Sequence, residues 1–156
     1  MLGFFEWCEA TAIGSVVRES VWLFPAIEAV HLLGLSLLFG AIIVADLRLL
    51  GLGLSSRPIA EVLLGARRWV LAGLAVMVMT GVPLFLSEAV KCYYNPSFWV
   101  KMATLPVAIV FTFAVRDRVA RRPVADTSLS TRAIGAASLA LWFTVAAAGR
   151  WIGFSS

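Results

Sequence analysis

The sequence predicts an all-α protein, an integral membrane four-helix bundle preceded by a short N-terminal interfacial helix. Of its 156 residues, 61% are hydrophobic and 14% are charged, and the mean hydropathy is +0.93. The apolar residues gather in four stretches, each close to the roughly 20 residues that cross a bilayer as a helix. None of these stretches alternates between polar and apolar residues as the strands of a membrane barrel do.

Short loops join the four stretches, so we expect one domain over residues 1–156. The expected helices cover about 22–46, 58–90, 97–116 and 130–153. The first stretch is too long for a cleaved signal peptide and follows a segment of mixed charge, so it is interpreted as a retained helix. The leading segment carries aromatic residues among charges, which favours a short amphipathic helix at the membrane surface.

The distribution of lysine and arginine predicts the orientation of the helices. Nine basic residues lie in or beside the first and third inter-helix loops: Arg48, Arg57, Arg67, Arg68, Arg116, Arg118, Arg121, Arg122 and Arg132. The other four lie on the opposite side: Arg18, Lys91, Lys101 and Arg150. This bias predicts that both termini lie outside and that the Arg-rich loops lie in the cytoplasm; in a bacterial inner membrane, the outer side is the periplasm. The net charge of +4 then reflects topology and contact with the lipid bilayer, and nucleic acid is not an expected partner.

The two cysteines, Cys8 and Cys92, both fall on the predicted periplasmic side. An oxidising compartment permits a disulfide between them. Sequence alone does not show that they meet, so two free thiols remain the alternative.

Two ionisable residues, Glu28 and His31, lie inside the first apolar stretch. An ionisable group at that depth costs a few kcal/mol, so it usually faces a partner, a cavity or a cofactor. At 1.5 Å per residue, His31 lies about 13 Å below the outer surface, and Met79 of the second helix lies at about the same depth. The pair of Glu28 and His31 is therefore the best indication of a functional site.

Further charged residues are expected in the outer half of the bundle, above His31. They are two acids, Glu28 and Glu88, and two bases, Lys101 and Arg150. A structural ion-pair network among them is one interpretation. The other is a ligand pocket in which Lys101 and Arg150 meet an anionic group of the ligand.

Short motifs in the first and third helices resemble those of small four-helix bacterial membrane proteins. The motifs are His31-x2-Gly34, Gly40, Leu47-Arg48-Leu49 and Trp99-x-Lys101. They are similar to the HemJ-type protoporphyrinogen oxidases and the copper-resistance D family. The chain as a whole resembles an uncharacterised family with a Pro25-x2-Glu28-x2-His31 opening and a Gly149-Arg150-Trp151 ending.

The resemblance implies haem b in the bundle, with His31 as an axial ligand of the haem iron. The functional histidine and lysine of the HemJ-type family correspond to His31 and Lys101. The additional histidines of the copper-resistance proteins are absent, which excludes a bis-histidine site within one chain. The iron is then five-coordinate, bound by His31 and Met79, or bridged between two chains. Glu28, one turn above His31, is a candidate acceptor for the other ring N–H.

Three classes of function remain open. The first is a haem-binding redox protein, either an electron carrier or a porphyrinogen-oxidising enzyme. The second is a non-catalytic subunit that packs in a larger membrane complex. The third is a pathway for protons or a small solute past Glu28, His31 and Glu88, for which we expect a homo-oligomer. No nucleophile–base catalytic set, phosphate-binding glycine motif or zinc-ligand spacing is present in the sequence.

Overall fold

The computed structural model describes residues 1–121 and 128–153 of the chain, and every regular element in these ranges is a helix. Four helical segments are long and apolar enough to cross a membrane: Leu23–Leu50, Ile59–Ser87, Pro96–Val119 and Leu129–Ile152. The predicted fold class, an all-α bundle of membrane type, is therefore confirmed. The elements in order are α1 (Leu2–Glu9), α2 (Ala12–Glu19), α3 (Leu23–Leu50), α4 (Ile59–Ser87), α5 (Ala89–Tyr94), α6 (Pro96–Val110), the π-helix η1 (Phe111–Arg116), α7 (Asp117–Val119) and α8 (Leu129–Ile152).

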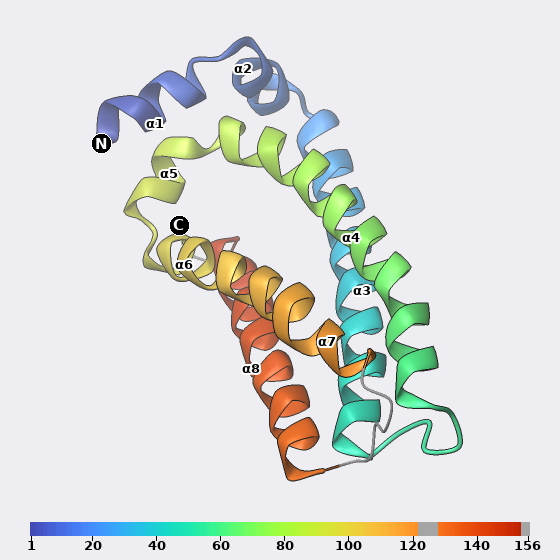
Figure 1. Ribbon diagram of the computed structural model, residues 1–156. Helices are drawn as coiled ribbons and strands as arrows, with labels where there is room; N and C mark the ends of the chain where they lie inside the picture. The colour runs from blue at the N-terminus through green and yellow to red at the C-terminus, as the bar shows by residue number, and fades with distance from the viewer. Residues whose placement is uncertain (122–127, 154–156) are drawn as a thin grey trace.

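The long helices pack as two pairs (Figure 1). Helix α3 lies along α4, α6 lies along α8, and the pairs meet where α3 contacts α8. The N-terminus, α5 and the start of α6 lie at one end of the bundle. We call this the aromatic end, after Phe5, Tyr93, Phe98 and Trp99. The opposite end is called the Arg-rich end, after Arg48, Arg57, Arg67 and Arg116.

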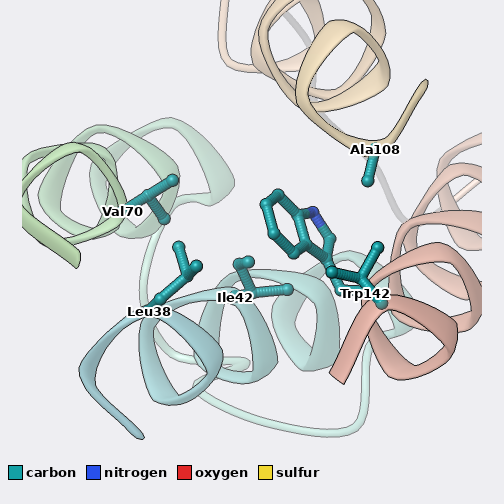
Figure 2. Close-up of a cluster of buried hydrophobic side chains, with 6 residues drawn as sticks. Leu38, Ile42, Val70, Ala108 and Trp142 are labelled. Carbon is teal, nitrogen blue, oxygen red and sulfur yellow. The ribbon is translucent and has the colours of Figure 1, made fainter. Parts of the chain in front are cut away.

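The buried centre lies where all four long helices approach one another (Figure 2). Its buried residues are Leu38 and Ile42 of α3, Val70 of α4, Ala108 of α6, and Trp142 and Val145 of α8. The indole Nε1–H of Trp142 donates a 2.9 Å hydrogen bond to Oγ1 of Thr112 in η1. This bond satisfies a donor that would otherwise be unpaired in an apolar environment, and it joins α8 to η1.

The bounds of α3 show how the chain terminates its first span. The sequence predicts an end near 46, whereas the helix continues to Leu50. Gly51 then adopts φ 76°, and its N–H bonds back to the carbonyl of Arg48. A left-handed residue is the usual helix stop, and glycine adopts it without steric cost.

The leading segment forms two short helices rather than the single one that the sequence predicts. Thr11 separates them, because its side chain accepts a hydrogen bond from the N–H of Gly14 and so caps α2. Phe5 of α1 lies among the rings of the aromatic end, with centroids 5.1 Å from Tyr93 and 6.1 Å from Phe98. The segment is thereby packed across the end of the bundle.

Polar contacts fix the same segment in place. The Glu9 carboxylate accepts a 2.7 Å hydrogen bond from the N–H of Val90 at the start of α5. Arg18 pairs with Glu9 at 3.2 Å. Cys8 and Cys92 are both buried at this end, and both are free thiols. The disulfide that the sequence left open is therefore not formed in the structure.

Candidate functional site

His31 lies on α3 and faces α4. Its Nδ1 is 2.7 Å from Oγ1 of Thr80. The Thr80 hydroxyl carries one hydrogen, which it donates to the carbonyl of Val76 at 2.6 Å. Thr80 must therefore accept from His31, so the proton of the neutral ring is on Nδ1.

This arrangement leaves Nε2 of His31 with its lone pair available. Nε2 makes no hydrogen bond to any residue of 1–121 or 128–153. The ring is only half-buried, so it is not sealed within the chain. Gly81 gives the ring room against α4, because a Cβ atom at this position would lie 3.3 Å from Cε1 of His31. An oriented imidazole with a free Nε2 is the usual state of a histidine that binds a metal.

Lys101 is the charged residue that the structure brings near this ring. It lies on α6, within electrostatic range of His31. Its ammonium reaches α8, where a Cβ atom at Gly149 would lie 3.5 Å from Nζ. In the described part of the chain the ammonium has neither a hydrogen bond nor an ion pair. His31 and Lys101 thus form the candidate site, with Thr80 as the residue that orients the imidazole.

The structure joins neither Met79 nor Glu28 to the ring. Met79 is 75% exposed, and it is Thr80, the next residue, that meets His31. Successive helical side chains diverge by about 100°, so the structure does not bring the Met79 thioether to the ring. Glu28 is half-buried and forms no ion pair or side-chain hydrogen bond with the described residues. Arg150 is exposed at the end of α8.

The ion-pair network predicted among the four outer charges takes a different form. Glu88 pairs with Lys91 at 3.7 Å, three residues further along the chain, rather than with Lys101. Both side chains of this pair are partly exposed. A local pair forms more readily because the short spacing needs no agreement between two separate helices.

Sequence reasoning missed a second group of charges, at the Arg-rich end. Arg116 and Asp46 are both fully buried and lie 3.4 Å apart, joining the end of η1 to α3. Asp117 follows, with Arg67 of α4 at 3.6 Å. The signal available was the Arg116-Asp117 pair directly after an apolar stretch, at the same level as Asp46. The sequence predicts Arg116 at the edge of a loop, whereas the π-helix continues the span through it.

The donor set restricts which metals the site fits. No group of three or more His, Cys, Asp or Glu side chains that could hold a metal ion occurs within residues 1–121 and 128–153. A bare ion needs several protein ligands. A porphyrin supplies four nitrogen donors of its own and needs only an axial ligand from the protein. The single oriented imidazole therefore fits a haem iron better than a bare ion.

The fold and this site define a multi-pass helical membrane protein with one histidine oriented inside the bundle. The chain belongs to DUF6644, a family of unknown function, whose model matches residues 4–155. The predicted resemblance to an uncharacterised family is consistent with this match. No curated protein and no solved structure matches the chain.

Proposed function

We propose that this protein is a haem b-binding membrane redox protein in which Nε2 of His31 is an axial ligand of the iron. The observation that carries the proposal is the Nδ1–H bond from His31 to Thr80. It holds the neutral tautomer that ligation requires and fixes the plane of the ring. His31 is also the only histidine of the chain.

Lys101 has a distinct role in this proposal. Its ammonium lies near His31 and against Gly149, without a counter-charge in the described part of the chain. An unpaired cation inside a bundle is costly, and an anionic ligand group would offset that cost. Haem carries two carboxylates. We propose that Lys101 binds one of them, with Arg150 on the same side of the bundle as a second cation.

Haem bound at this site would supply one-electron redox chemistry. The protein's part is to hold the axial position with His31, orient the ring through Thr80 and neutralise charge with Lys101. The short motifs that carry His31 and Lys101 are the basis on which we propose either electron transfer or porphyrinogen oxidation, as in the HemJ-type proteins. Met79 has no support as a sixth ligand within one chain, because its side chain is exposed.

The membrane that holds this protein, and the orientation of the chain in it, are also part of the proposal. The Arg-rich end carries Arg48, Arg57, Arg67 and Arg116, which favours the cytoplasmic side of a bacterial inner membrane for this end. Both termini and the His31 site are then nearer the periplasm. The exposed apolar side chains of the long helices would contact lipid, or the neighbouring subunits of a homo-oligomer or larger complex.

The test is the absorption spectrum of the full chain, purified in detergent after haem-replete expression. We expect a Soret band corresponding to one haem per chain, and its loss in His31→Ala. Glu28→Gln is the matched control, since Glu28 lies one turn away on the same helix and forms no hydrogen bond with the ring in the described ranges. An unpigmented wild-type protein, or an unchanged spectrum in His31→Ala, would refute the assignment. An unpigmented protein that co-purifies with stoichiometric partners would favour the non-catalytic subunit.

A further inference from the structure

A groove of about 550 Å³ lies along the α3–α4 pair, away from the His31 site. Ser36, Gly40 and Val44 of α3 line one side of it, and Gly65 and Trp69 of α4 line the other. The groove extends to the Arg-rich end, where Arg57 and Glu61 also line it. Its volume is in the range of small-molecule sites.

The two glycines keep this groove open without serving the chain's own packing. A Cβ atom at Gly40 or at Gly65 would meet no described atom within 4 Å. By contrast, a Cβ atom at Gly73 would lie 2.8 Å from Cβ of Leu38, so Gly73 is needed for contact between α3 and α4. A glycine inside a helix costs about 1 kcal/mol relative to alanine. At Gly40 and Gly65 no contact with the residues that the structure describes offsets that cost.

The polarity of the groove changes along its length. From Ser36 to Val44 it extends about 12 Å along α3, most of the roughly 15 Å of hydrocarbon in one leaflet. Beside this apolar part, the Arg68 guanidinium lies 5.8 Å from the centroid of the Trp69 ring. Arg68 has no ion-pair partner in the ranges that the structure describes, whereas Arg57 is paired with Glu61 at 2.9 Å.

We propose that this groove binds one anionic phospholipid of the leaflet at the Arg-rich end. An acyl chain lies along Gly40 and Gly65, where a larger side chain would exclude it. The phosphate accepts hydrogen bonds from Arg68, whose guanidinium presents several donors. A lipid with net negative charge is preferred because the surrounding arginines leave this end of the bundle positively charged.

The experiment is native mass spectrometry of the detergent-purified full chain, titrated with palmitoyl-oleoyl phosphatidylglycerol or palmitoyl-oleoyl phosphatidylcholine. We expect the first lipid to bind at least about fivefold more tightly. Arg68→Gln should remove this preference, mainly by weakening binding of phosphatidylglycerol. Gly40→Leu should weaken binding of both lipids, because its side chain occupies the path of the acyl chain without disturbing the fold.

Two matched controls lie outside the groove on α8, namely Arg132→Gln and Ala140→Leu, both at exposed positions. Each should leave the titration unchanged. Equal affinity for the two lipids, or equal losses in Arg68→Gln and Arg132→Gln, would overturn the proposal. It is also overturned if Gly65→Cys forms a disulfide-linked dimer on oxidation in membranes, because a second copy of the chain then covers the groove.

Discussion

Nδ1 of His31 donates a 2.7 Å hydrogen bond to Oγ1 of Thr80, whose own hydrogen is committed to the carbonyl of Val76. One side chain of α4 thereby determines which nitrogen of an imidazole on α3 is free. The relationship links helix packing directly to chemistry, because it depends on the two helices approaching closely at Gly81. It also makes the proposed ligand role testable at a residue that never touches the iron.

Thr80→Val keeps the shape of the side chain and removes the acceptor for Nδ1–H. We expect haem affinity to fall about 10- to 100-fold, as is typical when the partner of a ligating histidine is removed. The measurement is haem titration of the apoprotein followed at the Soret band. Thr144→Val is the control, since Thr144 also bonds back to its own helix, at Ala140, but lies on α8. Equal effects of the two substitutions would mean that Thr80 does not act through His31.

The His31–Thr80 pair also shows how far sequence reasoning extends. Counting residues from the ends of the spans placed Met79 at the level of His31, and the partner is the next residue, Thr80. Depth follows from the rise of 1.5 Å per residue, so it is predictable to about one residue. The rotation of α4 is set by packing against α3, and a shift of one residue changes the side-chain direction by about 100°. The depth at which α4 meets His31 was therefore predictable, but which side chain at that depth faces the ring was not.

The four spans were predictable because each rests on a long run of apolar residues. The shorter elements were not. The loop after Ser87 contains a helix, α5, which depends on Glu9 of the distant α1 accepting the N–H of Val90. Likewise, Arg116 is buried only because η1 carries it to Asp46 on α3. The formation of α5 and the burial of Arg116 both depend on contacts between residues that are far apart in the chain.

Gly73 and Gly65, both on α4, should respond oppositely to the same substitution. Gly73→Ala places a methyl group 2.8 Å from Cβ of Leu38, so we expect about 1–3 kcal/mol of destabilisation from overpacking. The methyl group of Gly65→Ala meets nothing within 4 Å in residues 1–121 and 128–153, so this variant should be neutral or stabilising by up to about 1 kcal/mol. Unfolding in detergent by a denaturant titration measures both. Similar losses at the two positions would contradict the described packing of α3 on α4.

Cys92 should be a slow nucleophile. Burial, together with the nearby Glu88 carboxylate, raises the pKa of the Cys92 thiol to about 11. A raised pKa favours the protonated form, so at pH 8 almost no thiolate is present and alkylation depends on that small fraction. We expect iodoacetamide to modify Cys92 on the order of a hundred times more slowly than an exposed cysteine introduced by Ser130→Cys.

The pH dependence of the alkylation rate distinguishes a raised pKa of the Cys92 thiol from poor access of the reagent. The rate at Cys92 should continue to rise up to about pH 11, whereas the rate at the introduced cysteine should level off near pH 9. Peptide mass spectrometry of the alkylated protein gives both rates in one sample. A Cys92 rate that levels off near pH 9 would show that its thiol is not shifted.

Asp46 and Arg116 should be strongly coupled in stability. Both side chains are fully buried 3.4 Å apart, and one oxygen of Asp46 has no hydrogen-bond partner in the described ranges. Asp46→Leu leaves the buried Arg116 with Asp117, at 3.7 Å, as its ion-pair partner among the described residues, so we expect up to about 3 kcal/mol of destabilisation. Arg116→Leu leaves the buried Asp46 carboxylate without its ion-pair partner, so we expect the larger loss, about 3–5 kcal/mol. The double substitution removes both charges, so it should be more stable than either single variant.

This double-mutant cycle is measured by denaturant unfolding in detergent, with the exposed pair of Arg57 and Glu61 as the reference. Arg57→Gln should cost less than about 1 kcal/mol, because solvent already screens that pair. A coupling free energy between positions 46 and 116 that is well above zero would show that the two buried charges compensate each other. Additive losses would show that Asp46 and Arg116 do not compensate each other, and the joint between α3 and η1 would then rest on apolar packing alone.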